Sequence, residues 1–135
     1  MARSVVVDSG FLVALLSRRD RHHPWAASHA TRFAPPWTTC EAVLSETFHL
    51  VGSVGESSLA ELLRRGAVVI GFELRSELVP VLKLMRKYKN VPMSLADACL
   101  VRMTETLNDP VILTTDDDFR VYRRHSRQVV PCVRP

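Results

Sequence analysis

The chain has 135 residues, of which 47% are apolar and 24% charged; this composition is typical of one soluble globular domain and excludes compositional disorder. No run of eighteen apolar residues occurs, so we expect no membrane span. Lysine and arginine outnumber aspartate and glutamate by 18 to 14, and the resulting charge of +4 suits a polyanionic partner without proving one. We therefore expect a single domain over residues 1–135.

The cysteines and the N-terminal segment both bear on where the protein acts. Cys40, Cys99 and Cys132 are widely spaced and form no CxxC pair, which predicts a reducing cytoplasm with thiols used as small apolar side chains. The apolar N-terminal stretch resembles a signal peptide superficially, but Asp8 interrupts it and no small-residue cleavage site follows. We expect this stretch to belong to the fold.

Strands and helices alternate along the chain. The first half predicts, in chain order, a strand at Ser4–Val7, helices at Gly10–Leu16 and His22–Phe33, a short extended segment at Pro35–Cys40 and a helix at Glu41–Val51. Gly52 is expected to end that helix, with Gly52–Gly55 as an inter-helix turn. The second half predicts a helix at Glu56–Arg65, a strand at Ala67–Phe72, helices at Leu74–Tyr88 and Ser94–Leu107, a strand at Val111–Thr114 and a weaker one at Val129–Val133. Strands separated by such helices pair in parallel through crossovers, which predicts an α/β sandwich.

Two aspartates follow predicted strands closely. Asp8 comes directly after the run VVV, and Asp116 comes two residues after VILT. Because ligands bind beyond the carboxyl ends of parallel strands, both aspartates are expected at one site. Asp117 and Asp118 follow at once, and for Asp117 we favour a solvated turn or a helix cap over a site role.

A third aspartate, Asp97, lies within the apolar stripe of a predicted helix. Met93 precedes it by four residues, and Leu100 and Val101 follow by three and four. An unpaired buried carboxylate is costly, so Asp97 needs a cation, strong hydrogen bonds or a proton. Two interpretations stay open: a site residue, or one half of a salt bridge with a buried arginine.

The helix that begins at Glu41 offers two further acids. Glu46 shares a row with Val43 and Leu50, at the margin of the apolar face. Glu41 lies at the helix start, where the helix dipole favours a carboxylate whatever its function. Geometry therefore prefers Glu46 as the site residue.

Four motifs occur in order across the chain: VVVDSGFLVALL, TTCEAVLSETFHL, MSLADACLV and VILTTDDDF. Together they resemble the PIN-domain family, and more particularly the small VapC-type toxins of bacterial toxin–antitoxin pairs. The resemblance covers essentially the whole chain. It implies a three-layer α/β/α fold around a mainly parallel sheet, with residues 1–135 as one PIN-like nuclease domain.

The resemblance also implies an activity, which is endonucleolytic cleavage of RNA with Mg²⁺ or Mn²⁺, and a cognate antitoxin that occludes the site. The family's metal-binding acids correspond here to Asp8, Glu46, Asp97 and Asp116, with Asp118 as a fifth candidate. Three adjacent acids stand where the family pattern needs one or two, so the choice between Asp116 and Asp118 stays open. The oligomeric state also stays open, and a homodimer is compatible with the sequence.

The chemistry of these side chains agrees with that implication. Oxygen ligands without a thiolate or histidine box suit Mg²⁺ or Mn²⁺ rather than zinc. Asp8, Asp97 and Asp116 are expected mainly to hold metal, while Glu46 is either a ligand or the group that orients the attacking water. No HExxH, GxGxxG, Walker A or GxSxG motif occurs, so other common chemistries lack support.

Several polar and aromatic residues have secondary roles in this interpretation. Ser9 and Thr115 either hydrogen-bond the site carboxylates or serve as caps and strand ends. Trp25 and Trp37 are expected in the core rather than stacked on bases, and His22 in a solvated loop. Fifteen of the eighteen cations are arginines, and two clusters are candidates for contacts with the RNA backbone: Arg18, Arg19 and Arg21, and Arg120, Arg123, Arg124 and Arg127.

Two classes of function remain. The leading one is a metal-dependent endoribonuclease acting as a toxin, with a housekeeping RNA-processing nuclease as its nearest variant. The second is a non-catalytic RNA-binding or protein-binding domain on the same fold. Loss of a site acid would have favoured the second class, and none is missing.

Overall fold

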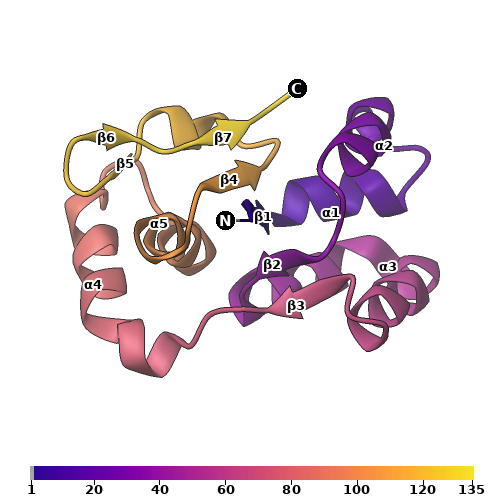
Figure 1. Cartoon of the computed structure of the whole chain (residues 1–135), viewed down its shortest axis with the longest axis horizontal. Coiled ribbons are helices and arrows are strands. Elements are labelled where there is room, and N and C mark those ends of the chain that lie inside the picture. The colour runs from indigo at the N-terminus through magenta and orange to yellow at the C-terminus, as the bar shows by residue number, and fades with distance from the viewer. Residues whose placement is uncertain (1) are drawn as a thin grey trace.

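The computed structural model describes residues 2–135, and this part of the chain forms five α-helices and a five-stranded parallel sheet (Figure 1). The sheet has the order β3-β2-β1-β4-β7. Its strands are β1 (Ser4–Val7), β2 (Trp37–Thr39), β3 (Val68–Ile70), β4 (Pro110–Leu113) and β7 (Cys132–Val133). A separate antiparallel hairpin contains β5 (Arg123–Arg124) and β6 (Gln128–Val129).

Helices cover both faces of the sheet, as Figure 1 shows. One face carries α1 (Ser9–Leu16), α2 (His23–Arg32) and α3 (Glu41–Arg64), and the other carries α4 (Leu74–Lys87) and α5 (Leu95–Thr106). A parallel sheet covered on both faces needs strands that are apolar throughout, which explains the buried runs VVV in β1 and VIL in β4. The expected three-layer α/β/α fold is confirmed.

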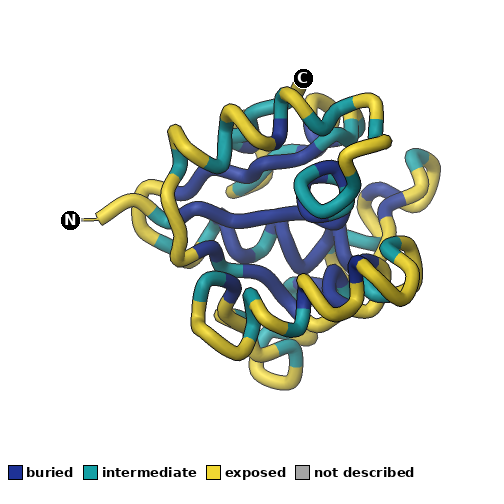
Figure 2. Tube along the Cα trace, turned by 90° about the vertical axis from the view of Figure 1, so that its right-hand side faces the viewer, coloured by how far each residue is buried: buried dark blue, intermediate teal, exposed yellow. Residues whose placement is uncertain are grey.

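The core lies along the central strands, where Figure 2 shows the buried segments crossing the middle of the molecule. Phe11 of α1 meets the rings of Trp25 and Trp37 edge to face, at 5.9 and 5.3 Å between centroids. Both tryptophans therefore pack in or against the core, as expected, and Trp37 is buried. Cys40 and Cys99 are also buried, and the three cysteines carry free thiols. No helix among residues 2–135 has the length and apolarity to cross a bilayer.

The expected pair of helices around Gly52 is one long helix with a kink. Gly52 has φ 69° and ψ −174° inside α3, a backbone conformation that is almost restricted to glycine. The predicted break at Gly52 is confirmed, but the turn expected over Gly52–Gly55 is wrong because the helix resumes at once. The first half of α3, which carries Glu46, ends at this kink.

The C-terminal segment also differs from expectation. Val129–Val133 was expected to form one weak strand, but the structure places β6 in the hairpin and β7 at the edge of the main sheet. Pro131 lies between the two strands, and since it has no backbone N–H it cannot continue a ladder as a donor. Its carbonyl accepts a hydrogen bond from the Ile112 N–H at 2.9 Å, which holds the segment against β4.

The kink generates a prediction about stability. Gly52→Ala should lower the free energy of unfolding by about 1–3 kcal/mol, since alanine cannot adopt this conformation without strain. Ser53→Ala, at the exposed neighbouring position, is the matched control and should change it by less than about 0.5 kcal/mol. Urea unfolding measures both, and equal stability of the two variants would show that the break does not depend on glycine.

Candidate active site

The sheet topology brings the ends of β1 and β4 together. From β1 the chain builds outward to β2 and β3, then crosses back to form β4 on the other side of β1. Val7 pairs with Leu113, so the two strands end level with one another. Ligands bind in open parallel sheets at such a switch point, beyond the carboxyl ends of the strands. A pocket of about 440 Å³ lies there.

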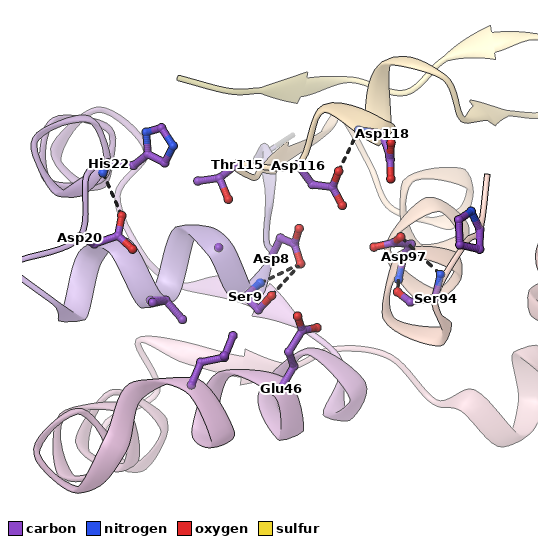
Figure 3. Close-up of a pocket in the computed structure, with 14 residues that line it drawn as sticks. Asp8, Ser9, Asp20, His22, Glu46, Ser94, Asp97, Thr115, Asp116 and Asp118 are labelled. Atoms are coloured by element: carbon purple, nitrogen blue, oxygen red, sulfur yellow. Dashed lines mark hydrogen bonds between the residues drawn. The ribbon is translucent and has the colours of Figure 1, made fainter.

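Carboxylates dominate this pocket, hereafter the acidic pocket. Figure 3 shows their side chains directed into it from the residue before α1, the turn between α1 and α2, α3, α5 and the segment after β4. Its acids are Asp8, Asp20, Glu46, Asp97, Asp116 and Asp118. None of the described residues that line it is a lysine or an arginine. All five acids proposed from the sequence thus line one pocket.

Asp8 is the most buried of these acids and is held from two sides. As the N-cap of α1 it accepts the Ser9 backbone N–H at 2.7 Å, and its other oxygen accepts the Thr114 hydroxyl at 2.6 Å. The pKa of Asp8 is raised to about 6, chiefly because the carboxyl is buried; these two hydrogen bonds lower it, and the charges of Asp97 and Glu46 add to the rise.

Asp97 lies at the N-terminus of α5, in a capping box with Ser94. The Ser94 hydroxyl accepts the Asp97 N–H at 3.0 Å, and the Asp97 carboxylate receives the Ser94 N–H at 3.4 Å. The Tyr122 hydroxyl donates to the same carboxylate oxygen at 2.9 Å. The alternative of a salt bridge to a buried arginine is wrong, because these neutral donors satisfy Asp97. Burial raises its pKa, and the charge of Asp116 adds to the rise.

The three consecutive aspartates after β4 take different positions. Asp116 caps the short 3₁₀ helix η1 (Asp117–Arg120) by accepting the Asp118 N–H at 2.8 Å. Asp118 also lines the pocket, and burial followed by the charges of its two neighbours raises its pKa. Asp117 is exposed and binds Arg134 at 2.6 Å, as its expected surface role requires. Asp116 and Asp118 both remain candidate ligands.

Glu46 reaches the pocket from α3, on the wall opposite Asp116 (Figure 3). It is exposed, so its carboxylate remains hydrated and its side chain keeps rotamer freedom. Glu41, earlier on the same helix, does not line this pocket. Its place in the first turn of α3 agrees with the helix-dipole explanation.

The structure adds residues that the sequence did not single out. The partner of Asp8 is Thr114, whose hydroxyl also accepts the Asp116 N–H at 3.0 Å, whereas Thr115 lies on the pocket wall. His22 and Asp20 line the pocket too, and His22 lies in the turn before α2, as expected. The sequence offered one signal for Thr114: it ends the predicted strand Val111–Thr114, at the sheet edge where ligands bind.

Gly10 shows how closely the two halves of the site approach. A Cβ atom at Gly10 would lie 2.0 Å from Thr115 Oγ1 and 3.1 Å from its Cβ. The start of α1 and the segment after β4 can therefore approach this closely only because residue 10 has no side chain. These contacts explain the motif DSG. Asp8 caps α1, Ser9 supplies the backbone N–H that Asp8 accepts, and Gly10 leaves space for the side chain of Thr115.

The acids share a pocket without forming a closed chelate. Among residues 2–135 no three His, Cys, Asp or Glu side chains are arranged closely enough to hold one metal ion. Mutual repulsion favours such separation, because the lining supplies no cationic side chain to offset it.

The fold and the pocket together define an α/β/α protein with an acid-lined site at its topological switch point. The chain belongs to the PIN-domain family, whose sequence model matches residues 5–124. Among solved structures it is similar to the Mycobacterium tuberculosis toxin VapC20, described as cleaving the sarcin–ricin loop, with 19% identity and a TM-score of 0.77. That likeness covers 87% of this chain and 94% of the other, and shows a shared fold. A comparison with curated proteins gave no match.

The raised pKa of Asp8 predicts a pH dependence of the metal-free protein. The folded state holds the Asp8 proton more tightly than the unfolded state, so stability falls as pH rises from about 4 through about 6. At roughly 1.4 kcal/mol per pKa unit, the rise from 3.8 to about 6 costs about 3 kcal/mol once Asp8 is ionised. Asp8→Asn should lack this loss, so its stability relative to wild type should increase with pH.

Chemical unfolding in EDTA between about pH 4 and pH 7.5 measures the difference. Asp117→Asn, which removes an exposed carboxylate, is the control and should follow the wild-type curve. If the free energies of unfolding of wild type and Asp8→Asn changed with pH in the same way, the prediction would be contradicted.

Proposed function

We propose that this protein is a divalent-metal-dependent endoribonuclease and the toxin of a toxin–antitoxin pair. The observation that carries the proposal is the acidic pocket at the switch point of the sheet, with six carboxylates and no lysine or arginine among the described residues that line it. Membership of the PIN-domain family supports it, and so does the shared fold with a toxin described as cleaving the sarcin–ricin loop. The proposed site of action is the cytoplasm, where the three free thiols stay reduced.

The donor set fits Mg²⁺ or Mn²⁺. Carboxylate oxygens are the ligands that these ions prefer, and no cysteine lines the pocket. One oxygen of Asp97 and one of Asp116 are anchored by hydrogen bonds, while their second oxygens have no partner within residues 2–135. Anchoring fixes the direction of each free oxygen, which reduces the entropy cost of binding an ion. A chelate of three acids needs at least one rotamer change, and exposed Glu46 is free to make it.

The residues have separate tasks in the proposed reaction. A bound ion would neutralise charge on the scissile phosphate and lower the pKa of the attacking water. Asp8, Asp97 and Asp116 would hold it, with Asp118 as a further ligand. Glu46, on the opposite wall, would orient the water and accept its proton as a general base. Thr114 and Tyr122 position Asp8 and Asp97 through their hydroxyl groups.

Cleavage should require both the metal and the anchored acids. Asp8→Asn, Asp97→Asn or Asp116→Asn should each lower the rate of RNA cleavage by about 100-fold or more, because each removes a charge and displaces the ion. Asp117→Asn is the matched control, since it lies in the same acidic run but binds Arg134 outside the pocket. Purified protein incubated with total RNA, with Mg²⁺, with Mn²⁺ or with EDTA, provides the measurement. Undiminished cleavage in excess EDTA would overturn the metal mechanism.

Metal binding should also appear as a gain in thermal stability, independently of activity. An ion that binds only the folded state stabilises wild type by about 2.7 kcal/mol at a hundred times its Kd. Asp97→Asn should respond much less, while in EDTA it should be as stable as wild type or more so, because one repelling charge is gone. The asparagine oxygen can still accept the Tyr122 hydroxyl, so the fold keeps its main contact.

Thermal melts with and without Mg²⁺ test this. A variant that melts far below wild type in EDTA would show that Asp97 is needed for folding rather than for the ion. An equal gain from Mg²⁺ in both proteins would place the ion elsewhere.

The proposed toxin role has its own test. Expression of the chain alone should arrest growth, and co-expression with the product of a neighbouring reading frame should relieve the arrest and co-purify with the chain. Harmless expression together with no recovered partner would leave a housekeeping nuclease as the better description.

A further inference from the structure

A second pocket, of about 210 Å³, lies between α4, α5 and the β5–β6 hairpin. Its charged and ionisable lining residues are Lys83, Lys87, Arg102, Glu105, Arg123 and His125. Four cations thus face a single acid. We call this the cationic pocket; its composition is the reverse of that of the acidic pocket.

Side-chain contacts hold the walls of the cationic pocket in place. Lys87 Nζ donates to the Ser126 carbonyl at 3.1 Å, and the Glu105 carboxylate accepts the His125 N–H at 2.7 Å. The hairpin tip is thereby tied to both helices. His125 and Ser126 have φ values of 48° and 70°, a left-handed backbone that costs free energy in residues other than glycine. A tip held in that conformation by two helices makes the pocket a preformed feature.

The cations differ in how far they are neutralised. Arg102 is paired with Glu77 at 2.7 Å and with Glu105 at 3.2 Å, so its role is to brace α4 against α5. Within residues 2–135, Lys83, Lys87 and Arg123 have no carboxylate within salt-bridge distance. The pocket therefore presents three uncompensated positive charges. Such an arrangement attracts an anion.

The lining also indicates what kind of anion fits. Among the described residues, no phenylalanine, tyrosine or tryptophan lines the pocket, so it offers no surface on which a base could stack. Lysine and arginine side chains with a small volume suit a phosphate group. Contacts of that kind position a nucleic acid without reading its sequence.

The cationic pocket and the acidic pocket share structural elements. Asp97 and Arg102 lie on the same helix, α5, with Glu105 three residues further, which corresponds to about 8–12 Å along the helix axis. Tyr122, which donates to Asp97, is followed directly by Arg123. The Arg123 N–H in turn donates to the Tyr88 hydroxyl at 2.9 Å. Both pockets are thus built on α5 and on the segment that contains Tyr122 and Arg123.

If the acidic pocket cleaves RNA, the RNA must also contact positive charge outside that pocket, because the lining carboxylates repel it. Two divalent ions would neutralise about four charges, which leaves part of the charge of the six lining carboxylates to repel a polyanion. Affinity for RNA must then come from cations elsewhere on the molecule. The cluster Arg120–Arg127 supplies less than expected, because Arg124 donates to the Thr104 carbonyl. Arg123 contacts three carbonyls of its own segment through Nη1 alone, so its other guanidinium nitrogens remain available to an anion.

We propose that the cationic pocket binds a backbone phosphate of the RNA substrate, outside the cleavage site, through Lys83, Lys87 and Arg123. The inference rests on the proposed nuclease function and adds the region that holds the substrate. Its contribution is independent of RNA sequence.

The test compares Lys83→Gln/Lys87→Gln with Arg65→Gln/Arg75→Gln, a control that removes two exposed cations lining neither pocket. Binding of a labelled single-stranded RNA of about twelve nucleotides is measured in EDTA at several salt concentrations. The slope of log affinity against log salt should fall by about 0.7 for each phosphate that the variant no longer binds. We expect the pocket variant to lose about tenfold in affinity at low salt and the control less than twofold.

Lys83→Gln alone, at an exposed side chain, should lose part of this affinity, and its thermal melt serves as a check on folding.

The outcomes separate this inference from the proposed function. If both double variants keep the wild-type affinity and slope, the cationic pocket does not bind RNA. If inorganic phosphate binds there and alters the rate of cleavage while RNA affinity is unchanged, the pocket is an effector site and the inference fails. If the pocket variant loses affinity but wild type cleaves nothing with any metal, the phosphate site is supported and the nuclease function is overturned.

Discussion

The hydrogen bonds of Thr114 hold the two halves of the acidic pocket together. Its hydroxyl donates to the carboxylate of Asp8, 106 residues earlier in the chain, and accepts the backbone N–H of Asp116. The pairing of β1 with β4 sets the position of Thr114, because Val7 and Leu113 lie in register beside it. A shift of β4 by one residue would turn Thr114 away from Asp8 and detach Asp116 from the site. The assembly of the acidic pocket therefore depends on the register of two buried strands.

The same arrangement offsets part of the repulsion among the acids. Asp8, Asp97 and Asp116 each stand at the N-terminus of a helix and accept a backbone N–H there. Free N–H groups and the helix dipole favour negative charge at these positions. Asp8 nevertheless has a raised pKa because it is buried and has other acids nearby, so the caps reduce the cost without removing it. Stability for this edge of the sheet comes from the apolar core beneath it, in which Val6, Val7 and Leu113 are fully buried.

Capping and a site role had looked like alternatives for Asp117 when only the sequence was considered. The neighbouring Asp116 shows that one carboxylate can cap a helix and still line the pocket, because one oxygen accepts the Asp118 N–H and the other has no partner within residues 2–135. The fold and the shared location of the acids could be predicted, since apolar runs and helix starts are local signals. The Tyr122–Asp97 contact could not, because it joins residues 25 positions apart through a side chain that no pattern marks. The hairpin was missed for a similar reason: β5 and β6 have two residues each and lack apolar alternation.

The distribution of charge separates two requirements that one pocket cannot meet. A site that concentrates divalent ions needs a negative potential, while a site that holds RNA needs a positive one. The chain carries a net charge of +4, yet its principal pocket is lined by six acids and no described cation. Arg18, Arg19 and Arg21 are sequence neighbours of Asp20, which lines that pocket, and the cationic pocket takes lining residues from α5, the helix that carries Asp97. An RNA strand that contacts these cations and crosses the acidic pocket would have its scissile phosphate over a region that repels it unless a metal is bound. On this account binding of the substrate and binding of the ion are coupled, because the ion removes the repulsion that the flanking cations must otherwise overcome.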